Sequence, residues 1–286
     1  MMDWPNRAPF AAAITFDMDA DSLIHAADPE GWKRPYAISM GQYGPTVGVP
    51  RILETYRRLG LRQTFFIPGW CVKTYPHAVE AILKGGHEIG CHGWIHENPA
   101  ARTVAEQGED LDRALEAMAA FSGYRPKGYR APVYLLTNDT PGLIADRGFT
   151  YDSSMMADDE PYALDLGGRT LIEIPTHWGI DDWPPFAHYA EIGYMMPVRG
   201  PTEGLAPFFE EFAAAKADAG LWHAVWHPFL TGRRARWQVV ERWLETALTE
   251  GAWFATLGEI ADHAETLRRA GRLRSIAFPT YAERQE

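Results

Sequence analysis

Two histidines four residues apart, His92 and His96, stand in the stretch HEIGCHGWIHENP, directly after a short apolar run that predicts a buried strand. Near the N-terminus a second apolar run ends in the acidic stretch TFDMDAD, which contains Asp17 and Asp19. Neutral imidazoles and a carboxylate are ligands that hold Zn²⁺, or a similar first-row metal, with positions left open for water. Such a metal can generate hydroxide near neutral pH, so these residues together predict a metal-dependent hydrolase.

The two N-terminal carboxylates should point into the same space. Side chains alternate along a strand, so Asp17 and Asp19 share one face and Met18 takes the other. One carboxylate can bind the metal while the other takes a proton from the water. Geometry alone lets either one touch the metal.

The histidine motif surrounds a short strand expected at residues 88–91. His92 ends this strand, and His96 follows in a turn that can return its imidazole to the same ion. Cys91 faces away from His92 on a strand, so we expect it in the core. His87 precedes the strand at its other end, and we expect it at the ordinary protein surface.

Two further candidates for chemistry end other strands. Arg130 lies in GYRAPVY, and a bidentate pair with Asp17 would keep that carboxylate ionised. His227 lies in LWHAVWHPF, at the end of an aromatic-rich strand and away from the expected ligands, and is the general-acid candidate. His223, on the same strand face, is expected to be a core histidine.

A third group of residues could support the ligands or contact substrate. Glu97 and Asn98 are candidates for orienting the imidazoles, and Pro132 follows Arg130 closely enough to join them. Trp178 and Trp183 stand in IEIPTHWGIDDWPPF, after another expected strand. These aromatic side chains could form a platform for a sugar or flat ring, or a hydrophobic plug between loops, and both interpretations stay open.

Composition limits the class of protein. The 286 residues are 46% hydrophobic and 23% charged, as in soluble globular proteins. A formal charge of -11 argues against nucleic-acid and anionic-membrane partners, because no basic cluster offsets it. The start of the chain has no signal-peptide pattern, and two cysteines form no disulfide framework, so we expect a cytoplasmic protein. A homo-oligomer is possible.

Short apolar runs alternate with amphipathic stretches along one expected domain, residues 1–286. We expect strands at residues 12–16, 63–67, 88–91, 128–130, 148–151, 171–174, 221–226 and 253–256. We expect helices at residues 49–59, 77–84, 103–122, 140–146, 202–219, 236–250 and 258–270. This alternation predicts an α/β fold, a TIM-like (β/α) barrel with its chemistry at the C-terminal strand ends. Residues 19–48 lack a strong period, so we expect a long loop over the barrel mouth.

With these residues in view, the chain resembles the polysaccharide deacetylase (NodB-homology) family. TFDMD is similar to that family's TFDDG motif, HGWIH to its HxxxH metal motif, RAP to its Arg-x-Pro motif and WHP to its late histidine motif. The resemblance runs from about residue 12 to residue 257. It implies a distorted barrel, a Zn²⁺-type ion on one Asp and two His, and hydrolysis of an amide such as the N-acetyl group of an amino sugar.

The resemblance also implies how the two carboxylates divide their roles. Asp17 matches the first aspartate of TFDDG, the base, which pairs with Arg130. Asp19 then takes the metal position that Met18 cannot fill, since a thioether is a poor ligand for such ions. His227 matches the acid. Co, Mn, Ni and Fe are alternatives to Zn for this donor set.

Two departures from the family's motifs bear on the substrate. The adjacent Asp-Asp pair has become Asp17-Met18-Asp19, and Glu97 follows the second histidine. Both resemble the branch with Helicobacter-type peptidoglycan deacetylase, cyclic imide hydrolases and allantoinases. We therefore expect a small or intracellular amide, either an N-acetylated sugar or a cyclic imide. The alternative class, an inactive carbohydrate-binding protein, would be favoured by loss of a motif residue, and none is lost.

Overall fold

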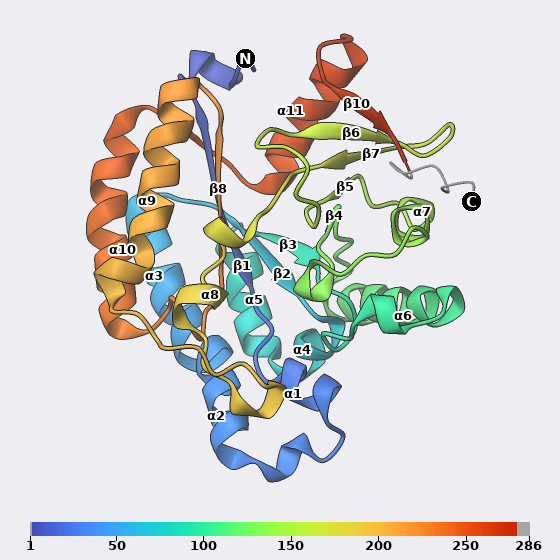
Figure 1. Ribbon diagram of the computed structural model, residues 1–286, viewed down its shortest axis with the longest axis vertical. Coiled ribbons are helices and arrows are strands. Elements are labelled where there is room, and N and C mark those ends of the chain that lie inside the picture. The colour runs from blue at the N-terminus through green and yellow to red at the C-terminus, as the bar shows by residue number, and fades with distance from the viewer. Residues whose placement is uncertain (1, 279–286) are drawn as a thin grey trace.

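A computed structural model describes residues 2–278, and its strands form one mixed sheet (Figure 1). The order of neighbouring strands is β10-β6-β7-β5-β4-β3-β2-β1-β8, and β9 pairs with β1 outside this path. The strands are β1 (Ala11–Asp17), β2 (Thr64–Ile67), β3 (Glu88–Cys91), β4 (Gly128–Tyr129), β5 (Tyr151–Asp152), β6 (Tyr162–Asp165), β7 (Thr170–Glu173), β8 (Leu221–Trp226), β9 (Trp253–Phe254) and β10 (Ser275–Ala277).

The α/β fold class is confirmed, with a barrel that is distorted rather than closed. Among the described residues β8 and β10 stand at opposite ends of the strand order. The pairs are parallel except β6 with β7, which are antiparallel. Only a short turn joins β6 to β7, and such a turn cannot make the long crossover that parallel neighbours need. The sequence patterns did not predict β6 and β10.

Most helices pack on the outer face of the curved sheet, where buried residues of α3, α6, α9 and α10 share one hydrophobic cluster (Figure 1). In this view α3, α9 and α10 lie on the left, and α6 and α7 on the right. The helices are α1 (Ser22–Ala27), α2 (Pro35–Tyr43), α3 (Val49–Leu59), α4 (Gly69–Thr74), α5 (Pro76–Lys84), α6 (Val104–Ser122), α7 (Thr140–Asp146), α8 (Trp183–Phe186), α9 (Pro201–Asp218), α10 (Arg234–Ala247) and α11 (Leu257–Arg269).

Residues 19–48 are largely helical, so the prediction of a long loop there was wrong. They contain α1, α2 and short helical turns at Gly31–Lys33 and Gly44–Gly48. Helix α2 packs backbone to backbone on the main chain beside Asp19, since a Cβ at Gly41 would collide with the carbonyl oxygen of Ala20. These elements lie near the C-terminal ends of the strands, where the expected loop was placed (Figure 1).

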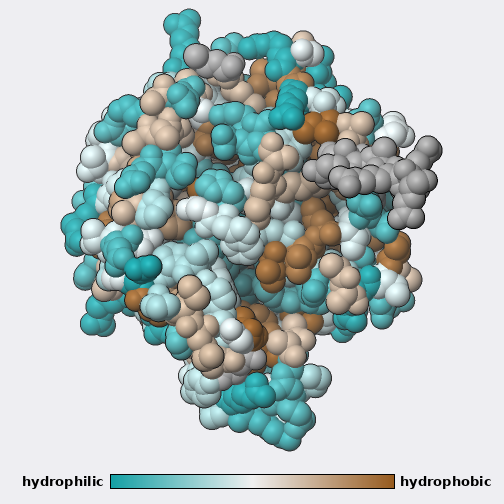
Figure 2. Space-filling model, in the orientation of Figure 1, coloured by the Kyte–Doolittle hydropathy of each residue, from teal (hydrophilic) through white to brown (hydrophobic). Residues whose placement is uncertain are grey.

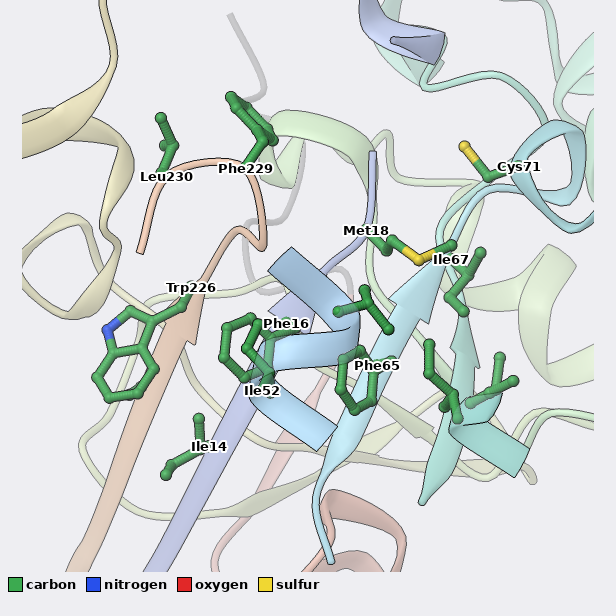
Figure 3. Packing of buried hydrophobic residues seen from close by; sticks show 14 of the residues in the cluster. Ile14, Phe16, Met18, Ile52, Phe65, Ile67, Cys71, Trp226, Phe229 and Leu230 are labelled. Atoms are coloured by element: carbon green, nitrogen blue, oxygen red, sulfur yellow. The ribbon is translucent and has the colours of Figure 1, made fainter. Parts of the chain in front are cut away.

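The alternation of β1 separates the core from the site. Ile14, Phe16 and Met18 point into the larger hydrophobic cluster, where the Phe16 and Phe65 rings stack with centroids 5.3 Å apart (Figure 3). Trp226 of β8 meets the edge of Phe16 in the same cluster. The other face of β1 carries Thr15 and Asp17. The predicted two-residue period therefore fixes where the carboxylates point.

Two cysteines and one histidine complete the comparison with the sequence. Cys71 and Cys91 are free and buried, which confirms the core position expected for Cys91. His87 is buried, not at the surface, because Tyr56 of α3 and Phe65 of β2 pack against its ring. Its Nδ1 accepts a hydrogen bond from the Gln63 N–H at 3.1 Å. Within residues 2–278 no helix combines the length and apolar character needed to cross a membrane.

Candidate active site and metal centre

The C-terminal ends of neighbouring strands bring the predicted residues together. Strands β4, β3, β2, β1 and β8 are consecutive in the sheet, so the residues that follow them meet at one edge. The side chains gathered there are Asp17 and Asp19 after β1, His92 and His96 after β3, Arg130 after β4 and His227 after β8.

Asp19, His92 and His96 form a compact set of donors. His92 Nε2 lies 3.4 Å from Asp19 Oδ1, and His96 Nε2 lies 3.5 Å from Asp19 Oδ2. One donor atom from each residue lies within 4.8 Å of the other two. Both Asp19 carboxylate oxygens are buried and lack a hydrogen-bond partner among the described residues. A buried carboxylate without donors is costly, so this set fits a divalent cation.

The tautomer of His92 follows from its second nitrogen. Nδ1 lies 2.8 Å from the Arg130 carbonyl oxygen, which can only accept, so Nδ1 carries the proton. The lone pair is then on Nε2, which faces the carboxylates. A backbone carbonyl behind a ligand histidine is a common way to orient the ring.

His96 is positioned by a tight turn rather than by a side-chain partner. Its φ of +64° is unusual for a residue other than glycine. Glu97 closes this turn by accepting hydrogen bonds from the Trp94 and Ile95 N–H groups, at 2.9 and 2.7 Å. Asn98 accepts from the Ala100 N–H. Among the described residues neither side chain bonds to an imidazole, so the orienting role expected for Glu97 and Asn98 is not made by direct contact.

The predicted pair of Arg130 and Asp17 is confirmed as a contact. Arg130 Nη1 donates to Asp17 Oδ1 at 2.7 Å, and both side chains are buried. Burial raises the pKa of Asp17, but the positive charge of Arg130, with His92 and His227, outweighs it and lowers that pKa below its usual value. Asp17 is therefore ionised at neutral pH.

The pair is not bidentate, which corrects the expected geometry. Arg130 Nη1 also donates to Thr15 Oγ1, Nε donates to the Ser153 carbonyl, and Nη2 donates to Ser153 Oγ and to His223 Nε2. The guanidinium thus spreads its donors over several buried acceptors, and Asp17 Oδ2 stays free of it. Burial, followed by Arg130, lowers the pKa of His223 to about 3, so this core histidine is a neutral acceptor.

His227 is held by an aspartate that the sequence analysis did not assign. Asp182 Oδ1 lies 2.6 Å from His227 Nδ1, and the Asp182 carboxylate also accepts from the Thr231 N–H and hydroxyl. Burial opposes the charge on His227, yet Asp182, Asp19 and Asp181 together raise its pKa to about 10. His227 Nε2 lies 3.4 Å from Asp19 Oδ2, closer to the ligand set than expected.

A cavity of about 580 Å³ opens over these groups. Trp178 and Trp183 line it. The Trp178 and Tyr134 rings meet edge to face with centroids 5.2 Å apart, and the Trp183 and Tyr189 rings stack with centroids 6.1 Å apart. Pro132 packs beside Gly93 and is not among the residues that line the cavity. The lining residues are Asp17, Asp19, Leu23, Ala26, Ala27, His92, His96, Asn98, Val133, Tyr134, Trp178, Asp181, Trp183, Pro184, Ile192, Tyr194 and His227.

Four of the described residues other than glycine have a positive φ in the segments around this cavity. Ala20, His96, Val133 and Tyr134 have φ between +52° and +64°, and they lie in the segments that follow β1, β3 and β4; Asn6, Arg7 and Ala219 share this conformation elsewhere. For Val133, a β-branched residue, this conformation is a genuine outlier. Such strain persists where the surrounding structure enforces it, and functional sites are where it gathers.

Sequence reasoning missed three residues that shape the site. Asp181 and Asp182 were visible only as acids within an aromatic stretch, although their place just before Trp183 was a usable signal. Tyr134 gave no signal, because its hydroxyl donates to Asp181, which lies 47 residues away in sequence. These contacts depend on how distant segments pack.

The comparisons with known proteins agree with this geometry. The polysaccharide deacetylase family model matches residues 37–151. A Mycobacterium smegmatis protein of known structure, assigned as a polysaccharide deacetylase, is 33% identical, with a TM-score of 0.91 over 100% of this chain and 97% of its own. The chain belongs to the polysaccharide deacetylase family. It is therefore a hydrolase of carbon–nitrogen bonds other than peptide bonds.

Two further relatives extend the polysaccharide deacetylase match. The peptidoglycan deacetylase of Helicobacter pylori is 29% identical over 283 residues, covering 87% of this chain and 94% of that protein. The PuuE allantoinase structure is 20% identical, with a TM-score of 0.78 over 98% of this chain and 94% of that one, which shows a shared fold. Both are of the kinds named in the sequence analysis for the branch that the motif departures resemble.

Proposed function

We propose that this polysaccharide deacetylase homologue hydrolyses a small amide or cyclic imide with the help of one divalent transition metal, with zinc the first choice. Asp19, His92 and His96 would hold the metal. The observation that carries the proposal is the buried Asp19 carboxylate, which has no hydrogen-bond partner among the described residues and faces two imidazole nitrogens. A bound cation would polarise the substrate carbonyl and make water more acidic.

Asp17 is the proposed general base. Arg130 holds its Oδ1, so the charge stays on the carboxylate and Oδ2 is free to accept a proton from the attacking water. Oδ2 lies 3.8 Å from His92 Nε2, which places the base beside the proposed ligands. Asp17 would thus take the proton as the water oxygen adds to the carbonyl carbon.

His227 is the proposed general acid. Its Nδ1 is bound to Asp182, so its Nε2 is the nitrogen that lines the cavity. As the carbon–nitrogen bond breaks, a proton from Nε2 would pass to the leaving nitrogen, and Asp182 would stabilise the imidazolium before that transfer. The base ends β1, and the acid follows the neighbouring strand β8.

The cavity favours a small substrate. Its volume lies within the range of about 300–1,000 Å³ that is typical of small-molecule sites. The name of the Helicobacter pylori relative favours a second candidate, the N-acetyl group of an amino sugar. The predicted cytoplasmic location stays a prediction.

The test combines metal analysis with a substrate panel. Purified protein should contain about one transition metal per chain, and a chelator should abolish turnover. The panel is succinimide, hydantoin, allantoin, chitooligosaccharides and muropeptides. Activity that survives complete metal removal would overturn the mechanism, and activity on polymeric sugars alone would overturn the preference for a small substrate.

A further inference from the structure

One carboxylate in the cavity is assigned neither a metal ion nor a proton transfer in the proposed chemistry. Asp181 lies between β7 and α8 and is 3% exposed. Its backbone forms a parallel bridge with Val225 beside β8, and the next N–H, of Asp182, donates to the Val225 carbonyl at 3.0 Å. The sheet therefore holds this side chain firmly in the cavity wall, as a preorganised recognition group requires.

The contacts of Asp181 leave acceptor capacity on both oxygens. Oδ1 accepts from the Trp183 N–H at 2.7 Å, and Oδ2 accepts from the Tyr134 hydroxyl. Each carboxylate oxygen can accept a second hydrogen bond. Asp181 is not the partner that orients His227, since Oδ1 is 4.0 Å from Nδ1 while Asp182 already occupies that nitrogen at 2.6 Å.

Among the described residues, Asp181 is the cavity carboxylate that neither the proposed metal nor a hydrogen bond from a cationic side chain holds. Arg130 pairs with Asp17, His227 pairs with Asp182, and a bound cation would offset Asp19, whereas Asp181 Oδ1 lies 4.0 Å from His227 Nδ1. Among the described residues no lysine or arginine lines the cavity. A substrate carboxylate placed beside Asp181 would meet a like charge, whereas an N–H or O–H would find an acceptor.

The walls beside Asp181 are flat and apolar. Tyr134 and Trp178 meet edge to face on one part of the wall, and Trp183 presents its ring from another. Flat aromatic surfaces favour a ring-shaped ligand by dispersion and apolar burial.

We propose that Asp181, held in place by Tyr134, determines specificity by accepting a hydrogen bond from an uncharged, ring-shaped amide and by excluding substrates that carry a carboxylate. This inference rests on the proposed function, because it assigns the cavity to the substrate of that reaction. The donor on the substrate lies away from the bond that breaks. The ring is either a cyclic imide or an N-acetylated sugar, and the test separates the two.

The experiment compares uncharged and anionic members of two matched pairs. These are hydantoin with hydantoin-5-acetate, and N-acetylglucosamine with N-acetylmuramate. Metal-loaded wild type, Asp181→Asn and Tyr134→Phe are compared, with Asp159→Asn as the control that removes an exposed acid elsewhere. Steady-state kinetics give kcat and KM for ligands that are hydrolysed, and ligand-observed NMR gives dissociation constants for those that are not.

Wild type should prefer the uncharged member of the pair that it recognises by about tenfold or more, and Asp181→Asn should reduce this preference by a similar factor. Tyr134→Phe should also reduce the preference for the uncharged member, by a smaller factor. Asp159→Asn should leave this preference unchanged. The change in preference should fall on KM or the dissociation constant. Any change in kcat should be equal for both members of a pair, because Asp181 also raises the pKa of His227. Equal binding of both members by wild type, or an unchanged preference in Asp181→Asn, would overturn the inference.

Failure of this inference is distinguishable from failure of the proposed function. Hydrolysis without discrimination by charge would leave the function standing and remove Asp181 from specificity. Charge-selective binding that depends on Asp181, with no hydrolysis of any ligand, would keep the recognition site and remove the proposed reaction.

Discussion

The two ends of β3 carry one buried histidine each, and only one of them is equipped for chemistry. His87 precedes the strand and His92 follows it, with 6% and 2% of their surfaces exposed. His87 accepts a backbone N–H on Nδ1 and packs against Tyr56 and Phe65. His92 instead donates from Nδ1 to a carbonyl and turns Nε2 towards two carboxylates. The partners of the ring, not its burial, separate a structural histidine from a candidate ligand.

The largest effect expected from this comparison comes from His92→Asn. The asparagine amide can still donate to the Arg130 carbonyl, but Nε2 is removed from the ligand set. We expect metal content and turnover to fall to the level of metal-free protein. The matched His87→Asn keeps an acceptor for the Gln63 N–H and should keep both. Full metal occupancy in His92→Asn, measured by elemental analysis, would contradict the assignment.

The next effect concerns the acid at the end of β8. His227→Ala should lower kcat by about 10²–10⁴-fold, because it removes the proton donor for the leaving nitrogen. Metal content should be retained, since Asp19, His92 and His96 supply three ligands without His227. Both quantities are measured on one preparation. Loss of the metal would make His227 a ligand.

Arg130→Met tests how much the buried Arg130–Asp17 ion pair contributes to the free energy of unfolding. Removing the guanidinium leaves Asp17 buried without its partner, which should cost about 3–5 kcal/mol in the free energy of unfolding. Arg58→Met, which breaks an exposed ion pair with Glu241 and Glu245, is the control and should cost much less. Urea unfolding measures both. Similar losses of unfolding free energy in the two variants would mean that the buried contacts of Arg130 do not stabilise the protein more than an exposed ion pair does.

The smallest effect is the acid sensitivity that His87 adds at the opposite end. Burial, followed by Arg62, lowers the pKa of His87 to about 4, against about 6.5 when unfolded. The unfolded state therefore binds more protons as pH falls from 6.5 towards 4, and the protein loses stability on the order of 1–3 kcal/mol over that window.

His87→Asn should remove this part of the acid loss while leaving stability at neutral pH nearly unchanged. Unfolding curves between pH 4 and 7 measure it. His77→Asn, on the exposed side of α5, controls for replacing a histidine as such. If the loss of unfolding free energy between pH 7 and pH 4 were the same in His87→Asn as in wild type, the pKa of His87 would not be lowered in the folded protein.

The parts of the molecule that could be predicted are those set by local pattern. The ends of β1, β3 and β8 follow from apolar runs that stop at polar residues, and strand alternation placed both aspartates correctly. The surface position expected for His87 was wrong, because the packing that covers it comes from α3 and β2. Figure 2 shows hydrophilic side chains over the projecting segment between α1 and α2, which explains why no core period marked these helices.

The cavity walls could not be predicted for a related reason. Tyr134 meets Asp181 and Trp178 across segments far apart in sequence, and β8 fixes Asp181 through its backbone. Pairing between backbones of distant segments leaves no pattern of residue types that the sequence could reveal. The motifs therefore identified the candidate reaction centre, while the groups that we propose select the substrate became visible only in three dimensions.

The most direct test measures metal content and kcat for Asp17→Asn and Asp19→Asn side by side. Asp19 faces both proposed histidine ligands and lacks another hydrogen-bond partner among the described residues, whereas Asp17 is bound to Arg130. Asp19→Asn should lose the metal, and Asp17→Asn should keep it while kcat falls by about 10²–10⁴-fold. Metal lost from Asp17→Asn and kept by Asp19→Asn would contradict the account and exchange the roles of the two carboxylates.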